Sequence, residues 1–209
     1  MERVAADVLW ARHGENVANL TRTLSYRVFD GDLTDVGRRQ ARELGERLAA
    51  RAADPVRLLA CSPLRRARQT ADIVGQRLGL PVAMELDDLR EVNVGELDGR
   101  SDAQAWDIYA AVLAAWRAGD TLARFPGGEN RDELCARLLR ALTEVAHSAT
   151  AERSLVVAHG ANLRAALPCL AGEPDPGADL PTGGVAALHV HPGGFPVVRL
   201  VSWPGAAPG

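Results

Sequence analysis

Two histidines of this 209-residue chain stand in the same local pattern. The apolar segment VLWA runs into Arg12-His13-Gly14, and the apolar segment SLVVA runs into His159-Gly160. In an open α/β sheet the carboxyl ends of the strands face the ligand crevice, and the helices that follow them present unpaired N–H groups to anions. We therefore expect the two imidazoles to converge on one anion. For either histidine alone, a hydrogen-bonded packing role is the alternative.

A third junction, LLACSPLRRA, has the same form. Ser62 is a good N-cap and Pro63 fits the first helical position. Arg65 or Arg66 would then bring a guanidinium to the same edge of the sheet. Arginine alone is weak evidence, because all 24 basic residues are Arg and none is Lys. The absence of lysine excludes Schiff-base, pyridoxal and P-loop chemistry.

Short apolar segments alternate with longer amphipathic ones along most of the chain. This alternation predicts an α/β fold, a three-layer sandwich whose mostly parallel central sheet is flanked by helices. The expected strands are 4–11, 57–61, 81–85, 154–158, 185–190 and 196–202. The expected helices of the main layers are 35–53, 63–78 and 130–147.

Residues 92–129 interrupt this alternation, because Gly-containing turns there flank an expected helix over 102–118. We interpret the segment as a small helical cap insertion over one end of the sheet. It would belong to a single domain spanning residues 1–203, and the tail 204–209 is expected to be disordered.

The bulk composition limits the partners. The formal net charge of −3 gives no electrostatic footprint for nucleic acid or an anionic membrane, and no stretch is long and apolar enough to span one. Cys61, Cys135 and Cys169 are widely spaced and odd in number, so we expect neither a disulfide framework nor a cysteine zinc site. A cytoplasmic location follows as the default expectation.

Six segments in order resemble one known family. These are LWARHGENVAN, GDLTDVGRRQA, CSPLRRARQTA, LREVNVGELDG, PGGEN and VVAHGANLR, which lie between residues 9 and 164. They are similar to the signature blocks of the histidine phosphatase superfamily, also called the phosphoglycerate mutase-like family. The resemblance implies the fold of that family and phosphoryl-transfer chemistry without a metal or another cofactor.

The resemblance also implies a role for each matching residue. His13 would be the nucleophile that carries the phosphoryl group, which suits a neutral imidazole. Arg12, Arg66 and His159 would clamp the phosphate, with a protonated His159 as a third positive group. Glu91 matches the general acid, for which apolar neighbours would raise the pKa. A surface carboxylate is the alternative interpretation of Glu91.

Two asparagines are secondary candidates for substrate binding. Asn19 matches an Asn that the family places near the phosphate. Asn16 stands where the family usually has Thr or Ser, and its amide can still donate a hydrogen bond.

Hydrolysis of a small organic phosphomonoester is the preferred interpretation over mutase chemistry. A mutase needs a second set of cations for a doubly phosphorylated intermediate, and the cap offers only Arg100, Arg117 and Arg124. Phosphoglycerate mutase activity, a non-catalytic phospho-ligand binding protein and a metal-dependent hydrolase with His13, His159 and Glu91 as ligands remain alternatives. A homodimer is a further possibility.

The cap is rich in aromatic residues. Trp106, Tyr109, Leu113 and Trp116 are spaced to share one helix face. Such a face mostly packs against the rest of a domain. The alternative is a hydrophobic wall for a bulky leaving group, to which Tyr26 and Phe29 would contribute.

Overall fold

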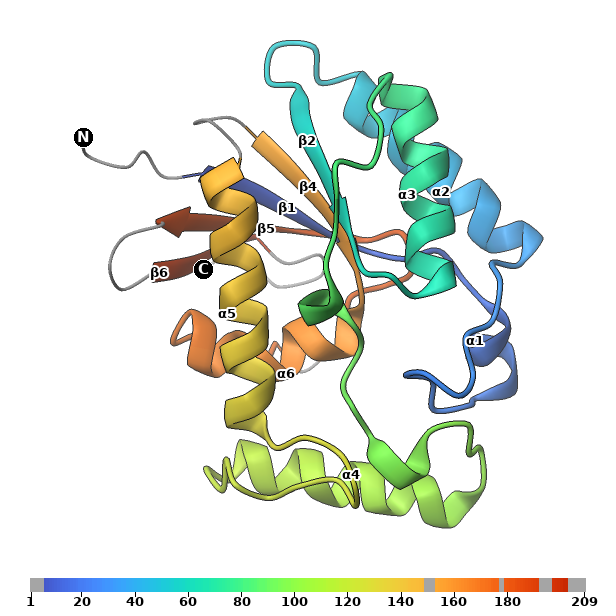
Figure 1. Ribbon diagram of the computed structural model, residues 1–209, viewed down its shortest axis with the longest axis vertical. Coiled ribbons are helices and arrows are strands. Elements are labelled where there is room, and N and C mark those ends of the chain that lie inside the picture. Colours follow the sequence, from blue (N-terminus) through green and yellow to red (C-terminus); the bar gives the residue numbers. More distant parts are fainter. Residues whose placement is uncertain (1–5, 149–152, 177–178, 192–196, 203–209) are drawn as a thin grey trace.

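A central six-stranded sheet organises the protein, in the order β3-β2-β4-β1-β5-β6 (Figure 1). The structure is a computed structural model that describes residues 6–148, 153–176, 179–191 and 197–202. The strands are β1 (Ala6–Arg12), β2 (Val56–Cys61), β3 (Met84–Glu85), β4 (Arg153–Ala158), β5 (Val185–His191) and β6 (Val197–Ser202). All neighbours from β3 to β1 pair in parallel, and β5 is antiparallel to both β1 and β6. The predicted mostly parallel sheet is confirmed.

Helices cover both faces of the sheet, as expected for three layers (Figure 1). They are α1 (Val17–Thr21), α2 (Asp35–Ala49), α3 (Arg65–Leu78), α4 (Ala103–Arg117), α5 (Arg131–Ser148) and α6 (Gly160–Leu170), with the short 3₁₀ turns η1 (Asp87–Leu89) and η2 (Gly95–Leu97). Alternate residues of β1 belong to different cores. Leu9 packs in the cluster that contains α2 and α3, whereas Trp10 packs in the cluster that contains α5 and α6.

Several element boundaries differ from the predicted ones. The expected strand 81–85 pairs only at Met84–Glu85, and the helix expected over 35–53 ends at Ala49. The expected N-cap role of Ser62 is wrong, because α3 begins at Arg65 after Leu64. The first residues of the strand expected at 4–11, and the tail 204–209, lie outside the described residues.

The cap is built around α4, which lies beyond one end of the sheet (Figure 1). Trp116 and Phe125 are buried there with ring centroids 5.5 Å apart, and the indole N–H of Trp116 donates to the carbonyl of Ala123 at 2.7 Å. The indole of Trp106 donates to the carbonyl of Arg22 at 2.9 Å. The cap aromatics therefore share a core with the main layers. No helix among the described residues is long and apolar enough to cross a membrane.

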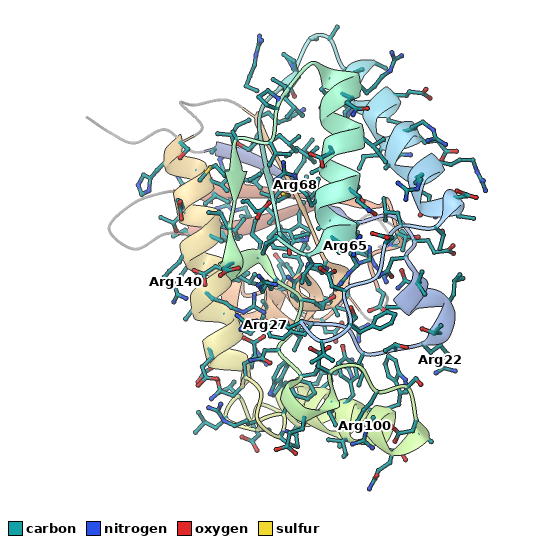
Figure 2. All side chains as sticks on the ribbon, turned by 45° about the vertical axis from the view of Figure 1, so that its right-hand side comes forward. Arg22, Arg27, Arg65, Arg68, Arg100 and Arg140 are labelled. Atoms are coloured by element: carbon teal, nitrogen blue, oxygen red, sulfur yellow. A yellow bond between two sulfur atoms is a disulfide. The ribbon has the colours of Figure 1, made fainter. Side chains whose placement is uncertain are left out.

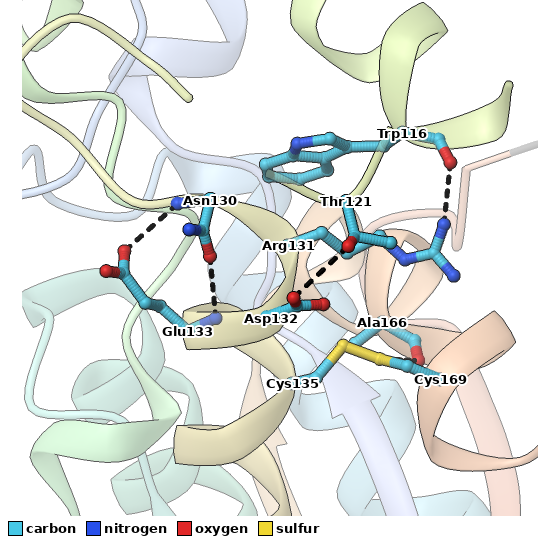
Figure 3. Close-up of a disulfide and its surroundings, with 9 residues drawn as sticks. All are labelled: Trp116, Thr121, Asn130, Arg131, Asp132, Glu133, Cys135, Ala166 and Cys169. Carbon is cyan, nitrogen blue, oxygen red and sulfur yellow. Dashed lines mark hydrogen bonds between the residues drawn. A yellow bond between two sulfur atoms is a disulfide. The ribbon is translucent and has the colours of Figure 1, made fainter. Parts of the chain in front are cut away.

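A disulfide joins Cys135 of α5 to Cys169 of α6, with a Cα–Cα distance of 6.4 Å (Figure 3). The expectation that the cysteines form no disulfide is wrong. The pair is 34 residues apart and meets only because α5 and α6 pack side by side, which spacing alone does not reveal. Cys61 is free and buried.

This disulfide is expected to stabilise the fold. Closing a loop of this length lowers the conformational entropy of the unfolded chain, which raises the free energy of unfolding by roughly 3–4 kcal/mol. Urea unfolding should therefore have a lower midpoint in the presence of a dithiol. The double variant Cys135→Ser, Cys169→Ser should have the same low midpoint with or without the reductant. Equal midpoints for the oxidised and reduced wild type would contradict the expectation.

Candidate active site

His13 lies where β1 ends, and it is buried, with 3% of its surface exposed. Its Nδ1 donates to the carbonyl of Gly14 at 2.7 Å, and its Nε2 accepts from Nε of Arg66 at 3.1 Å. A carbonyl can only accept, so Nδ1 carries the proton and Nε2 keeps its lone pair. Burial, reinforced by Arg66 and Arg12, holds the pKa of His13 well below its ordinary value. The imidazole is therefore neutral at neutral pH.

Arg66 is held rigidly in the first turn of α3. Its Nη1 donates to the hydroxyl of Ser25 and its Nη2 to the carbonyl of Ser25, both at 3.0 Å. Asp30 lies 3.5 Å from Nη1, and its carboxylate also accepts the backbone N–H of Arg65. Only 2% of Arg66 is exposed, so its guanidinium is fixed before any ligand arrives.

Arg66 differs in this respect from most arginines of the chain. Arg65, its neighbour, points outward and pairs with Asp32 at 2.8 Å. Figure 2 labels other arginines, among them Arg22, Arg27, Arg68 and Arg140, all of which are exposed. The abundance of arginine therefore reflects a solvated exterior, with Arg66 as a buried exception.

Arg12 is the last residue of β1, and its Nη1 donates to the carbonyl of Leu180 at 2.6 Å. Its side chain passes Gly160, where an added Cβ would lie 2.9 Å from Cδ of Arg12. An added Cβ on Gly14 would overlap the carbonyl oxygen of Gly37. The glycine after each histidine is thus required by close approach of a neighbouring group.

His159 is fully buried beside His13, with ring centroids 5.2 Å apart. Its Nε2 lies 2.9 Å from Oγ of Ser62, and that hydroxyl also accepts the N–H of Leu64 at 3.3 Å. The Ser62 hydroxyl can donate to Nε2 while it accepts from Leu64, and in that arrangement the proton of neutral His159 lies on Nδ1. This Nδ1 is buried without a hydrogen-bond partner among the described residues. An anion beside His13 would supply one.

The expected protonation of His159 concerns the transition state beside a phosphate, and it stays a prediction. Burial, together with Arg66 and His13, holds its pKa well below the ordinary value. In the ligand-free protein His159 is therefore neutral, and the positive charge around the site comes from Arg12 and Arg66.

Glu91 reaches the same site from the loop after η1. Its Oε1 accepts the N–H of Val92 at 2.9 Å and the N–H of Asn162, in the first turn of α6, at 2.8 Å. Burial raises the pKa of Glu91, although these hydrogen bonds and the two arginines oppose the change. A carboxyl group with a raised pKa suits proton transfer near neutral pH. The surface-carboxylate alternative does not describe Glu91.

Asn16 and Asn19 form a reciprocal cap at the start of α1. The Oδ1 of Asn16 accepts the N–H of Asn19 at 3.2 Å, and the Oδ1 of Asn19 accepts the N–H of Asn16 at 3.0 Å. The Nδ2 of Asn16 is buried without a partner within the described part of the chain. This amide is therefore a second donor available to an anion, whereas Asn19 is exposed at the rim of the same cavity.

A cavity of about 690 Å³ opens beside these groups. Its phosphate end is lined by Arg12, His13, Asn16, Arg66 and Glu91. The predicted cap face also lines it, with Trp106, Tyr109, Leu113 and Trp116. The cap aromatics therefore both pack together and form a cavity wall. The expectation for Tyr26 and Phe29 is wrong, because neither lines the cavity.

Sequence reasoning missed two parts of the site. Ser62 orients His159, although its position favoured a helix cap. A group of charged residues also lines the cavity away from His13 (Arg117, Arg131, Arg164, Asp175 and Asp179). These residues come from separate segments, and only Arg164 lies within one of the six motif segments. The described residues contain no group of three or more His, Cys, Asp or Glu side chains that could hold a metal, so His13, His159 and Glu91 do not form one.

Comparisons with known proteins agree with this geometry. The profile of the histidine phosphatase superfamily (branch 1) matches residues 8–202. The metal-independent phosphoserine phosphatase of Arabidopsis thaliana is 31% identical over 166 residues, which cover 79% of this chain and 68% of the relative. The 2,3-bisphosphoglycerate-dependent phosphoglycerate mutase of Methylobacterium sp. (strain 4-46) is 36% identical over 195 residues, which cover 88% of this chain and 89% of the relative.

A solved structure gives the same result. The mycobacterial glucosyl-3-phosphoglycerate phosphatase in complex with VO3 superposes with a TM-score of 0.76 at 29% identity, covering 94% of this chain and 98% of that one. The fold and the motif order thus agree with the profile match. The chain belongs to the histidine phosphatase superfamily, and its similarities favour a metal-independent phosphatase over a mutase.

Proposed function

We propose that the protein hydrolyses a small organic phosphomonoester through a phosphohistidine on His13. The observation that carries this proposal is the buried pair of His13 and Arg66, in which a neutral Nε2 with its lone pair lies 3.1 Å from a fixed guanidinium. A bound phosphate would take the N–H of Arg66 from Nε2, which frees the lone pair at the moment the phosphorus arrives. The arrangement thus couples phosphate binding to release of the nucleophile.

The first step would form the phosphohistidine. Nε2 of His13 attacks phosphorus while the bond from phosphorus to the leaving oxygen breaks, and Glu91 donates its proton to that oxygen. Arg12 and Arg66 supply paired donors to the phosphoryl oxygens as charge spreads over them. The buried Nδ1 of His159 and Nδ2 of Asn16 are the unpartnered donors that complete the clamp.

The second step would return the enzyme to its starting state. Glu91, now ionised, takes a proton from a water that attacks the phosphohistidine, and inorganic phosphate leaves with regeneration of neutral His13. Splitting the reaction in this way replaces one difficult displacement by two easier ones.

The names of the similar proteins bear on the substrate. Phosphoserine and glucosyl-3-phosphoglycerate are both small organic phosphates, and the cavity of about 690 Å³ accommodates an organic group of this kind. Mutase activity is the second candidate, since one relative at 36% identity is named as a mutase. We propose hydrolysis as the main activity. Water attacks a phosphohistidine unless the protein keeps it out of the site, as a mutase must.

The remaining partner and location predictions rest on the sequence alone. They are a possible homodimer, no nucleic-acid partner, no membrane partner and a cytoplasmic location. Disulfides such as Cys135–Cys169 persist mostly in oxidising compartments, so this bond counts against the cytoplasmic prediction.

A phosphomonoester panel tests the proposed function. The panel contains aryl phosphates, phosphoserine and 3-phosphoglycerate, the last with and without a 2,3-bisphosphoglycerate primer. We expect release of phosphate, fastest from the bulky aryl phosphates because of the aromatic wall. His13→Ala should abolish release, and His191→Ala, an exposed histidine outside the site, should not. Primer-dependent interconversion of phosphoglycerates without hydrolysis would favour the mutase, and an inactive wild type would favour a binding protein.

Exchange of arginine for lysine tests the clamp. Arg12→Lys and Arg66→Lys keep the net charge but lose the planar, paired donors. We expect kcat/KM to fall about 10²–10³-fold, the loss typical of one preorganised donor in a transition-state site. Arg65→Lys is the matched control, since Arg65 is adjacent to Arg66 but points to solvent, and it should retain activity. Near-normal activity of both clamp variants would remove Arg12 and Arg66 from the mechanism.

The pH dependence tests the roles of His13 and Glu91. The first step needs His13 unprotonated and Glu91 protonated. Because the pKa of His13 is lowered, activity should persist to acidic pH, and because the pKa of Glu91 is raised, it should decline only above the ordinary carboxyl range.

Glu91→Gln separates the two steps further. It should slow hydrolysis of an alkyl phosphate at least 100-fold, because a poor leaving group needs the proton. With 4-nitrophenyl phosphate, whose leaving group needs little help, a burst of nitrophenol should precede slow turnover. An unchanged pH profile and equal losses on both substrates would exclude Glu91 as the acid.

A further inference from the structure

The cavity has a second charged end, away from His13. It is formed where α4 ends, where α5 begins and along α6 with the segment that follows. Its lining residues are Arg117, Arg131, Arg164, Asp175 and Asp179. None of them is needed for the two chemical steps.

Most of this charge is neutralised within the protein. Nε of Arg117 lies 2.7 Å from Asp175, and Nε of Arg164 lies 3.0 Å from the same carboxylate. Arg164 also pairs with Asp179 at 2.5 Å. Arg131 has no carboxylate within ion-pair distance in the described ranges 6–148, 153–176, 179–191 and 197–202. This end of the cavity therefore carries one uncompensated positive charge, on Arg131.

The guanidinium of Arg131 is held in place but incompletely bonded. Its Nη1 donates to the carbonyl of Trp116 at 2.6 Å (Figure 3). Its backbone N–H donates to the carbonyl of Thr121 at 3.1 Å. Its Nε is buried and has no hydrogen-bond partner among the described residues. Among the residues drawn in Figure 3, only Nη1 of this guanidinium is engaged. Covering a cation without an anionic partner costs free energy, which a ligand anion would offset.

The two ends belong to one continuous cavity of about 690 Å³, so a molecule that fills it reaches both. Tyr109 lines the cavity between them, and it lies within electrostatic reach of Glu91 and Arg12 and also of Asp179 and Arg164. Its ring stacks on Phe125 with centroids 5.5 Å apart, which makes the intervening wall apolar and rigid.

We propose that Arg131 is a specificity-determining residue that binds a carboxylate on the leaving group of the substrate. This rests on the proposed function, in which the clamp of Arg12 and Arg66 holds the phosphate at the other end. The substrate class is a phosphomonoester whose organic part places an apolar or aromatic spacer against Tyr109 and Trp116 and ends in a carboxylate. A planar guanidinium suits a carboxylate better than a point charge does.

The test compares two probes that differ only in the carboxylate, phenyl phosphate and 4-carboxyphenyl phosphate. Steady-state kinetics are measured for the wild type, Arg131→Gln and Arg131→Lys. The control is Arg124→Gln, which removes an equal charge from the same cap, at a residue that pairs with Glu133 and does not line the cavity. Thermal unfolding of each variant reports on folding.

The wild type should prefer the carboxylated probe by at least about tenfold in kcat/KM, mostly through KM, as one charge-assisted pair provides. Arg131→Gln should abolish this preference while phenyl phosphate turnover stays within about threefold, Arg131→Lys should restore part of it, and Arg124→Gln should keep it whole. A wild type without the preference overturns the proposal. So does an equal loss on both probes in Arg131→Gln, which would show that Arg131 only anchors the cap.

The same probes separate this proposal from the proposed function. If the wild type hydrolyses neither probe, the proposed function fails. Calorimetric binding of the two probes to the wild type and to Arg131→Gln then decides the carboxylate subsite. Tighter binding of the carboxylated probe that depends on Arg131 supports it, and equal binding excludes it.

Discussion

The hydrogen bond from Nε of Arg66 to Nε2 of His13 is the interaction on which the site depends. It places a permanent cation against a neutral base in a buried space, and such a contact exists only where the surroundings hold both partners. His13 is fixed by the end of β1 and by its own bond to the Gly14 carbonyl, while Arg66 is fixed by α3 and Ser25. The loop of Ser25 and Asp30 thus serves the chemistry without touching the reacting atoms.

Electrostatics in this site follows from burial more than from formal charge. Two histidines next to two arginines stay neutral because removing an imidazolium from water is costly and the arginines add repulsion. The same burial acts on Glu91 in the opposite direction, since it disfavours the carboxylate. One enclosed space therefore lowers the pKa of the histidine and raises the pKa of the carboxyl group, which favours a neutral base and a protonated acid.

Much of the main scaffold was predictable from the sequence, and the reasons are local. His13 and His159 follow strongly apolar strands and precede glycines that the packing requires, so short motifs located both. The features that local patterns missed depend on contacts between distant segments. Ser62 meets His159 across 97 residues, and Cys135 meets Cys169 only through packing of α5 on α6. Arg131 likewise differs from Arg117 and Arg164 in that no carboxylate of the described residues lies within ion-pair distance of it.

The two carboxyl oxygens of Glu91 differ in their hydrogen bonds to the backbone. Oε1 accepts two backbone N–H groups, so it is a poor site for a proton. The transferable proton therefore belongs to Oε2, and its direction is set by the backbone and not by free rotation of the carboxyl. Since one of those N–H groups is in the first turn of the helix that follows His159, the proposed proton donor Glu91 and His159 share a single rigid support. A shift of α6 would misalign Glu91 and His159 at once, so the position of this one helix controls the alignment of both side chains.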